Sequence, residues 1–403
     1  MPSLIFRKGL DLKQEVAGTL ATSYHSALVQ DIKASDYRFV SGRLAVHLAR
    51  EFGFCYGVDR AVDYAYQASL RFPDRQVFLT GEIIHNPHVN DRLRSQGIRI
   101  LTDPGEDRRS LGPEDVVILP AFGVSLQDLA ELERQGCTLV DTTCGSVLNV
   151  WKNVRRYAQD GFTSVIHGKV HHEETRATAS QATAYPHGHY LIVRDREEAQ
   201  IACDFIRGGT AADAASFATQ FADAVSEGFD PVTHLERIGC ANQTTMLMAE
   251  SLAIGDMFKQ AMIERHGEAS LAERFRAFDT ICSATQERQD AVLALLDAEP
   301  LDLAVVIGGY NSSNTCNLAH MCEERVATYH IAEPACLVSA EEIRHRPIGA
   351  PSTADANEQT TRGWLPAGPV TIGLTAGAST PNNLIGEVIE RLERFAAGSE
   401  AQP

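Results

Sequence analysis

The sequence predicts an α/β protein in which parallel strands are covered by helices on both faces. From Arg43 onward, short Val/Ile/Leu runs alternate with longer stretches of helical spacing. Runs this apolar are typical of parallel strands buried between helices. The tetrapeptide DTTC at 141–144 returns as DTIC at 279–282, each time after an apolar run and before a helical stretch, so a strand-to-helix unit repeats. The expected strands are 116–120, 137–141, 163–168, 190–193, 303–309 and 370–375.

Composition restricts the class of protein. A chain of 403 residues with 44% hydrophobic content can bury two or three cores. The formal net charge of −17 argues against a nucleic-acid partner, because phosphate-backbone binding needs clustered Lys and Arg. No apolar run predicts a membrane span or a signal peptide, and acidic residues such as Asp11 count against a transit peptide. The nine cysteines are an odd number over a long chain, which favours thiols or metal ligands over disulfides.

The pattern also predicts a division of the chain. Residues 1–43 have weak periodicity and predict a peripheral helical extension. An Ala-rich stretch at 183–236 predicts an insertion, and the Pro-, Thr- and Gly-rich stretch 344–369 predicts a surface loop. The expected parts are the extension 1–43, three α/β units at 44–141, 142–280 and 281–391, and a tail at 392–403.

Three cysteines occupy the same place in the repeat. Cys144 and Cys282 end the two tetrapeptides, and Cys55 ends a looser version, EFGFC. A cysteine between a parallel strand and a helix lies at the ligand-binding edge of the sheet, beside a helix dipole that favours thiolate. Three such units about a pseudo-threefold axis would direct three thiolates at one point, one fewer than saturates a cubane iron–sulfur cluster. The alternative is three ordinary buried cysteines, which describes the other six better.

Small polar residues follow several of the expected strands. Tyr310-Asn311-Ser312-Ser313-Asn314 follows LAVVIGG, and a turn containing Ser379 follows VTIGLT. Hydroxyls, amides and backbone N–H groups at a helix start can bind phosphate without a lysine. A third cluster is Asn242-Gln243-Thr244-Thr245. Taken singly, each cluster could equally be a helix cap.

Histidines and carboxylates complete the set. His85 follows an apolar pair in GEIIHNP, and His171, His172, Glu173 and Glu174 follow the strand at 163–168. The HHEE run could bind a metal or form a solvated turn, although the HExxH zinc spacing is absent. A histidine with a carboxylate in a cleft can also bind an anion and move a proton. The residues alone do not choose between Glu173 and Glu174.

Eight stretches in order resemble the 4-hydroxy-3-methylbut-2-enyl diphosphate reductase (LytB) family. The resemblance covers about residues 45 to 390, and the long N-terminal part is similar to the cyanobacterial and plastid subgroup. It implies a trefoil of three α/β units around a [4Fe-4S] cluster, with one cysteine from each unit and one iron without a protein ligand. The matching stretches are FGFCYGVDRAV, GEIIHNPHVNDRL, DTTCGSVLNVWKNV, HHEETRATAS, NQTTM, DTICSATQERQDAV, GGYNSSNTCNLA and TAGASTPNNLI.

The resemblance also implies a role for individual residues. Glu174, matched through HEET, would be the proton donor, and the cluster ligands would be Cys55, Cys144 and Cys282. Many relatives have a histidine in an AHG turn where this chain has Phe122, so one diphosphate contact is lost or replaced there. The residues expected to bind substrate are His85, His172, Gln243, Thr244, Ser312, Ser313, Asn314 and Ser379.

The implied activity is a reductive dehydroxylation that yields isopentenyl and dimethylallyl diphosphate, the last step of the methylerythritol phosphate route to isoprenoids. Its partners would be the small diphosphate substrate and an electron donor such as ferredoxin or flavodoxin, with no nucleic acid or membrane. The expected location is the bacterial cytoplasm, with the plastid stroma as the alternative. Two other classes share some features: a hydro-lyase with an open-iron cluster, and a redox sensor that needs no anion-binding turns.

Overall fold

The computed structural model describes residues 4–278, 280–298, 300–350 and 357–398. Helices and mostly parallel strands alternate through these ranges, which confirms the predicted α/β class. All six predicted apolar runs form strands. Asp279, the first residue of the second tetrapeptide repeat, lies outside the described residues. No helix in the described ranges combines the length and apolar character needed to cross a membrane.

The strands of the described ranges form three sheets of four or five strands and one two-stranded sheet. Their orders are β1-β7-β6-β4-β5, β11-β10-β8-β9, β13-β12-β16-β3-β2 and β14-β15. The strands are β1 (Ile5–Phe6), β2 (Arg38–Ser41), β3 (Leu44–Leu48), β4 (Val77–Leu79), β5 (Arg99–Ile100), β6 (Val116–Leu119), β7 (Thr138–Asp141), β8 (Thr163–His167), β9 (Tyr190–Val193), β10 (Ile238–Asn242), β11 (Phe275–Ala277), β12 (Leu303–Ile307), β13 (Thr328–Ile331), β14 (Glu342–His345), β15 (Gln359–Arg362) and β16 (Val370–Ala376).

The three larger sheets repeat one strand order. In each sheet one strand leads to a predicted ligand cysteine: β7 leads to Cys144, β11 to Cys282 and β3 to Cys55. The next two strands in the sheet are β6 and β4 beside β7, β10 and β8 beside β11, and β16 and β12 beside β3. The predicted range 142–280 contains the four strands of one sheet. β3, from the predicted range 44–141, pairs with β16, from the range 281–391. The division of the chain into three consecutive units stays a prediction.

The helices connect these strands and cover the sheets. The helices are α1 (Lys13–Tyr24), α2 (Ala27–Ala34), α3 (Tyr56–Arg71), α4 (Pro87–Ser95), α5 (Leu126–Gln135), α6 (Gly145–Gln159), α7 (Glu173–Ala182), α8 (Arg196–Gly208), α9 (Ala214–Gln220), α10 (Pro231–His234), α11 (Met248–His266), α12 (Leu271–Arg274), α13 (Ser283–Ala298), α14 (Ser313–Glu323) and α15 (Asn382–Ala396). Four of the longer ones, α3, α6, α8 and α15, are amphipathic, which lets one face pack on the protein while the other meets water.

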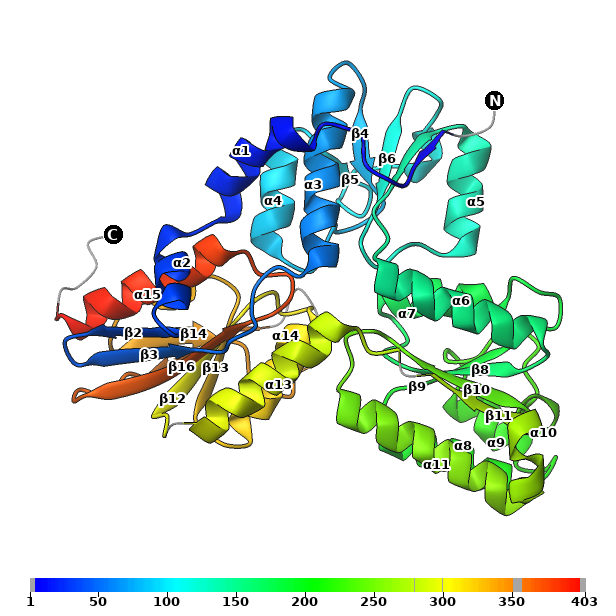
Figure 1. Cartoon of the computed structure of the whole chain (residues 1–403). Helices are drawn as coiled ribbons and strands as arrows, with labels where there is room; N and C mark the ends of the chain where they lie inside the picture. The colour runs from blue at the N-terminus through cyan, green and yellow to red at the C-terminus, as the bar shows by residue number, and fades with distance from the viewer. Residues whose placement is uncertain (1–3, 279, 299, 351–356, 399–403) are drawn as a thin grey trace. The chain divides into compact units, whose positions relative to one another are not determined.

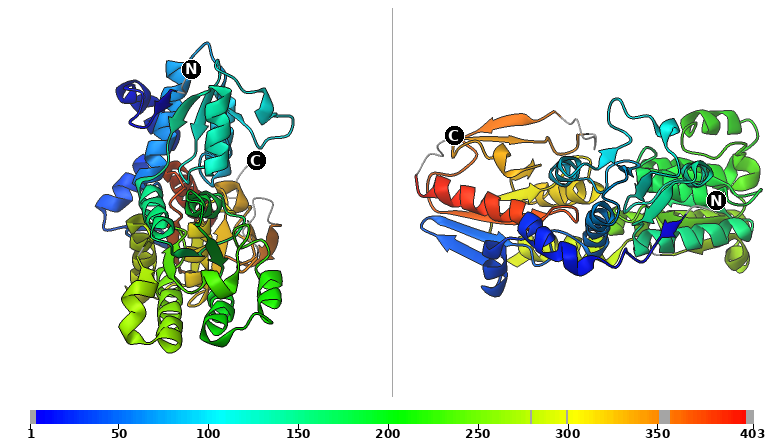
Figure 2. Two further views of the ribbon diagram at one scale, coloured as in Figure 1. Left: turned by 90° about the vertical axis from the view of Figure 1, so that its right-hand side faces the viewer. Right: turned by 90° about the horizontal axis from the view of Figure 1, so that it is seen from above.

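The chain groups into two compact units, which we describe separately. Unit 2 consists of Phe6–Arg108, Glu114–Ile118 and Ser283–Pro403. Its five-stranded sheet is covered on both faces, because alternate residues of β12 point to opposite sides. Leu303, Val305 and Ile307 pack with α2 and α15, whereas Ala304 and Val306 pack with α13 and α14. Figure 1 shows these two helix layers, and Figure 2 shows α15 (red) beside the blue segment that contains β2 and β3.

The N-terminal segment forms helices, as expected; most of α1 is exposed, but α2 packs into a core. Ser26 caps α2 by accepting a hydrogen bond from the Val29 backbone N–H. Val29 and Ile32, three residues apart on α2, are buried against α15 and the sheet. The weak periodicity of residues 1–43 concealed this short apolar face. The segment therefore supplies part of the core of unit 2.

The stretch 344–369 was expected to be a loop, and for part of its length this is wrong. β14 and β15 pair in antiparallel fashion, with Ile343 opposite Thr361. Residues 351–356 of the stretch lie outside the described residues. Turn-forming residues dominate its composition, but Gln359–Arg362 contains two threonines, which favour extended backbone. Residues 344–345 and 359–362 of the stretch therefore belong to a pair of antiparallel strands.

Unit 1 consists of Met1–Ile5, Arg109–Pro113 and Leu119–Cys282. Helices α8 and α11 pack on one face of its four-stranded sheet, and α6 and α7 pack on the other (Figure 1). β10 contacts both layers, since Ile238 and Cys240 face α8 and α11 while Ala241 faces α6. Gly239 lies flat against the Tyr157 ring, where an added Cβ would be 2.6 Å from the ring carbon Cδ2. The predicted insertion at 183–236 forms β9, α8, α9 and α10.

Candidate functional site

The three predicted ligand cysteines each lie at the start of a helix. Cys55 and Cys144 are the N-cap residues of α3 and α6, and Cys282 directly precedes α13. All three are partly exposed, whereas five of the other six cysteines are buried. Burial raises the pKa of Cys203 and Cys322 to about 12, so these two remain neutral thiols. The partly exposed cysteines at helix starts are thus the ones placed to bind a ligand or metal.

The backbone around these cysteines also repeats. Each cysteine donates its N–H to the carbonyl of the residue two positions beyond the end of a strand. That strand is β16, β6 or β10, which lies beside the cysteine's own strand in its sheet. The bonds are Cys55 to Ala378 at 3.1 Å, Cys144 to Ala121 at 2.8 Å and Cys282 to Thr244 at 3.3 Å. The three cysteines therefore occupy equivalent positions in three copies of one local structure, which short sequence motifs could only suggest.

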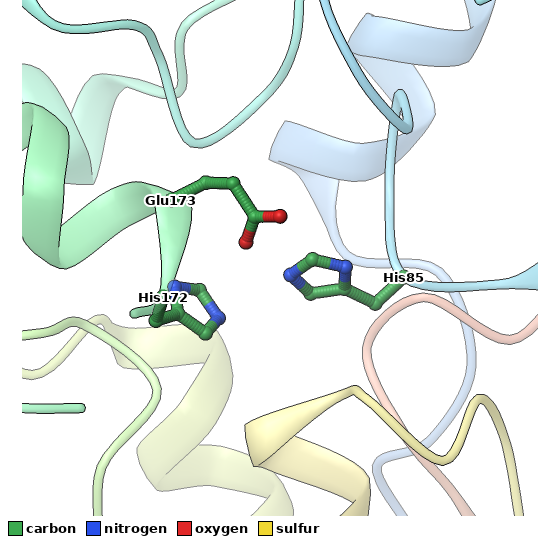
Figure 3. A group of neighbouring side chains, drawn as sticks. All are labelled: His85, His172 and Glu173. Atoms are coloured by element: carbon green, nitrogen blue, oxygen red, sulfur yellow. The ribbon is translucent and has the colours of Figure 1, made fainter. Parts of the chain in front are cut away.

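Glu174 and Glu173 differ sharply in environment although they are neighbours at the start of α7. Glu173 is exposed, and Figure 3 shows its side chain and that of His172 where the helix begins. Glu174 is only 2% exposed. Its Oε1 accepts from the Thr244 backbone N–H at 2.5 Å, and its Oε2 accepts from the Thr244 hydroxyl at 3.0 Å. The structure therefore fixes the carboxyl group of Glu174 in one orientation beside Thr244.

Gln243 lies in the same buried network. Its Oε1 accepts from the Lys169 backbone N–H at 3.1 Å and from the Thr175 hydroxyl at 3.0 Å, and its Nε2 donates to Thr245 at 2.8 Å. An added Cβ at Gly168 would lie 2.8 Å from Thr175 Oγ1 and 3.1 Å from Gln243 Cβ, so this close approach requires glycine. Gln243 thereby joins the loops that follow β8 and β10, and its predicted contact with substrate stays a prediction.

His172 caps α7, and its ring has two neighbours in unit 1. Its Nδ1 accepts from the Glu174 backbone N–H at 3.2 Å. The ring of Phe122 meets the imidazole edge to face, with centroids 6.2 Å apart. Phe122 occupies the position where the sequence analysis noted a missing histidine. At position 122, this chain therefore has an aromatic ring that packs on His172.

In unit 2, the predicted diphosphate-binding residues of two turns are joined. Ser312 caps α14 by accepting from the Thr315 backbone N–H at 3.3 Å. Asn314 Oδ1 accepts from the Ala378 backbone N–H at 2.9 Å, which ties the α14 start to the turn after β16. Ser312, Ser313, Asn314 and Ser379 are all buried. Asn314 Nδ2 is also buried and has no hydrogen-bond partner among the described residues, which is uncommon for a buried donor.

His85 belongs to the same cluster in unit 2. It lies in the loop before α4 and is labelled in Figure 3. Its backbone carbonyl accepts from the Ser379 hydroxyl at 3.1 Å. An added Cβ at Gly309 would lie 2.3 Å from that carbonyl oxygen, and one at Gly377 would lie 1.9 Å from Thr315 Oγ1. Two glycines thus allow the three turns to approach closely.

Within each unit, the structure brings the predicted residues together. The predicted residues fall into two groups, one in unit 1 and one in unit 2. The sequence analysis missed Glu82 and Asn311, which contact His85, although both lie within the motifs it noted. The contact of Asn311 gives no signal in the sequence, because Asn311 is 226 residues from His85. The unit 1 group is Cys144, His172, Glu174, Gln243, Thr244 and Cys282, and the unit 2 group is Cys55, His85, Ser312, Ser313, Asn314 and Ser379.

Comparisons with known proteins point to one family. The model of the family described as LytB protein matches residues 46–393. The 4-hydroxy-3-methylbut-2-enyl diphosphate reductase of Gloeobacter violaceus is 49% identical over 96% of this chain and 91% of its own length. The enzyme of the same name from Thermosynechococcus vestitus is 46% identical over 98% of this chain and 95% of its own length.

A solved structure shares the fold. It is that of the E-1-hydroxy-2-methyl-but-2-enyl-4-diphosphate reductase from Plasmodium falciparum. The two structures match with a TM-score of 0.60 at 20% identity, over 86% of each chain.

Proposed function

This chain belongs to the LytB family, and from that premise we propose that it reduces 4-hydroxy-3-methylbut-2-enyl diphosphate to isopentenyl and dimethylallyl diphosphate. The substrate takes up two electrons and two protons, its allylic C–O bond breaks, and the hydroxyl leaves as water. A one-electron carrier such as ferredoxin or flavodoxin supplies the electrons. The cyanobacterial relatives support a location in the bacterial cytoplasm, with the plastid stroma as the alternative.

The observation that carries the proposal is the threefold equivalence of Cys55, Cys144 and Cys282. Three thiols at helix starts, with matching backbone hydrogen bonds and partial exposure, fit a [4Fe-4S] cluster that has three protein ligands. Cysteine sulfur is the usual protein ligand of iron–sulfur clusters. Cys55, Cys144 and Cys282 would hold the cluster, which would pass on the electrons of the carrier and provide a Lewis-acidic iron.

The diphosphate is held by neutral donors and histidines in this proposal. Ser312, Ser313 and Asn314 form the first turn of α14, where backbone N–H groups and the helix dipole favour an anion. The buried Nδ2 of Asn314 is a further donor. His85, His172 and Ser379 complete the set. Because the diphosphate does not react, its binding energy positions the allylic carbon and hydroxyl for the chemical step.

Glu174 delivers the proton to the departing oxygen in this proposal. Thr244 holds both carboxyl oxygens, so the acid is oriented before the substrate arrives. A hydroxyl can donate to a carboxylate and accept from a protonated carboxyl group. Thr244 Oγ1 can therefore keep its contact with Glu174 before and after proton transfer. Gln243 supports Thr244 by fixing the loop that carries it.

The test is cluster content and turnover under anaerobic conditions. Cys55→Ser, Cys144→Ser and Cys282→Ser should each lose most of their iron and sulfide and the visible absorption of the cluster. Cys203→Ser is the matched control, because its thiol is buried in a hydrophobic core, and it should keep a full complement. The wild-type protein should consume substrate only with a reductant present. Full iron content in any of the first three variants would contradict the ligand assignment, and reductant-independent turnover would indicate a hydro-lyase.

A further inference from the structure

A carboxylate and an amide contact the imidazole of His85 within unit 2. Glu82 Oε2 lies 3.0 Å from His85 Nδ1. The same oxygen accepts a hydrogen bond from Asn311 Nδ2 at 2.8 Å, and Asn311 Nδ2 lies 3.2 Å from His85 Nδ1. Glu82 comes from the loop after β4, and Asn311 comes from the loop between β12 and α14. The two loops therefore meet at one side of the His85 ring.

The chemistry of these atoms decides which ring nitrogen carries the proton. A carboxylate oxygen only accepts hydrogen bonds, so a Nδ1 without a proton would direct its lone pair at a negative charge. A protonated Nδ1 instead gives two N–H donors, from His85 and Asn311, converging on Glu82 Oε2. The 3.2 Å separation of the two nitrogens follows from their sharing one acceptor.

We infer that Glu82, assisted by Asn311, is a positioning residue that fixes His85 as the Nδ1–H tautomer and sets the plane of its ring. This inference rests on the proposed function in one respect, namely that His85 binds the diphosphate. With Nδ1 bound to Glu82, the nitrogen that meets the diphosphate is Nε2. A phosphate oxygen only accepts hydrogen bonds, so Nε2 must carry a proton as well when it binds the diphosphate. Glu82 then remains the hydrogen-bond partner of the ring at Nδ1.

The backbone at His85 is held by other groups, so removing Glu82 changes the ring and not the loop. Ser379 donates to the His85 carbonyl at 3.1 Å, and Asn86, the next residue, caps α4. Asn90 also donates to the Ile84 carbonyl at 2.9 Å. A Glu82→Gln protein should therefore fold and bind its cluster like the wild type. Glutamine keeps the size of the side chain but can present either an oxygen or an NH₂ group to Nδ1.

The first measurement needs no ligand. Long-range ¹H–¹⁵N spectra of the full-length protein labelled with ¹⁵N-histidine distinguish protonated from unprotonated ring nitrogens, and the His85 signals are those lost in His85→Asn. Wild type should show a protonated Nδ1 at His85, and Glu82→Gln should show a mixture of tautomers. Glu324→Gln is the matched control, because Glu324 faces the exposed His320, and it should leave the His85 signals unchanged. An unprotonated Nδ1 in wild type, or a spectrum unaffected by Glu82→Gln, would overturn the inference.

The second measurement is the affinity for inorganic diphosphate by calorimetry. Glu82→Gln should weaken binding about tenfold, the lower end of what loss of a carboxylate behind a functional histidine costs. In the His85→Asn background the same substitution should have almost no further effect, since Glu82 acts through the ring. An equal loss in both backgrounds would contradict a role through His85. If the wild-type protein failed to bind diphosphate, this would contradict the proposed function. The role of Glu82 would still be decided by the tautomer of His85 in the first measurement.

Discussion

At the residue scale, the contrast between Glu174 and Glu173 leads to a direct test of the proton donor. Glutamine at 174 can keep the hydrogen bond from the Thr244 N–H but has no acidic proton to give. Glu174→Gln should therefore still bind substrate and lower kcat by a factor on the order of 10² or more, as expected when a general acid is lost. Anaerobic turnover with saturating reductant measures this.

The control for that experiment is the neighbouring residue. Glu173→Gln alters an exposed side chain on the same helical turn and should change kcat by less than about threefold, well below the contribution of a general acid. A damaged Glu173 variant beside a near-normal Glu174 variant would reverse the assignment.

The sequence placed the acid within two adjacent residues but could not choose between them from the residues alone. Neighbouring residues on a helix point about 100° apart, so one of them faces the protein and the other faces water. Which one is buried depends on the loop that carries Thr244, about 70 residues further along the chain. The contact of Asn311 with His85, across 226 residues, is similarly fixed by folding and not by local pattern.

At the scale of a single element, the start of α14 gives a second prediction. Asn314→Ala removes the buried Nδ2 donor and the bond from Asn314 Oδ1 to the Ala378 N–H. The KM for the diphosphate substrate should rise about tenfold, in line with the loss of a hydrogen bond to a charged group. kcat should fall too if the substrate is also misoriented. Steady-state kinetics of the variant separates the two effects.

A matched control is Asn149→Ala, which removes an exposed asparagine from α6. It should leave kcat and KM unchanged. If Asn314→Ala behaved in the same way, the α14 start would have to be removed from the proposed binding site.

The hairpin of β14 and β15 gives a third prediction. Glu358, just before β15, accepts a hydrogen bond from the Tyr310 hydroxyl at 2.8 Å and pairs with Arg344 at 3.0 Å. Tyr310 is buried and directly precedes the turn that is proposed to bind the diphosphate. Glu358→Ala removes the carboxylate acceptor of the buried hydroxyl and should lower the free energy of unfolding by about 1–3 kcal/mol. Urea denaturation measures this, with the exposed Glu341→Ala as a control that should cost less than about 0.5 kcal/mol.

The elements that were predicted correctly have in common a strong apolar pattern. β6, β8 and β12 are buried along their whole length, and their sequences show it. β14 and β15 alternate or face water, and their polar, turn-rich neighbourhood hid them. Partial burial of α2 was missed for a related reason, since two apolar residues are too few to define a periodicity.

At the scale of the whole molecule, two buried histidines predict how stability depends on pH. Burial lowers the pKa of His167 in unit 1 to about 4 and that of His330 in unit 2 to about 3. In the unfolded chain each titrates near its ordinary pKa of 6.5. Below pH 6.5 the unfolded state therefore binds protons that the folded state does not, and stability falls as the pH falls.

The expected size of this effect is about 2 kcal/mol per histidine at pH 5, because each pH unit below the unfolded pKa costs about 1.4 kcal/mol. Urea denaturation at pH 7 and pH 5 checks it. His167→Gln should make the loss of stability between these pH values smaller by about that amount. If the variant lost as much free energy of unfolding between pH 7 and pH 5 as the wild type, His167 would already be protonated in the folded protein.

The pairing of β3 with β16 has a consequence for synthesis of the protein. Leu44 lies opposite Val370, so a strand made early on the ribosome waits for a partner made more than three hundred residues later. The continuous segment Leu119–Cys282, by contrast, supplies most of unit 1 before that partner exists. Because domains fold as their chains emerge, unit 1 can form during translation before β16 has been made, while the sheet behind Cys55 closes only after β16 has emerged. In the proposed function, delivery of iron and sulfide to a complete set of three cysteines therefore has to wait until β16 has been made.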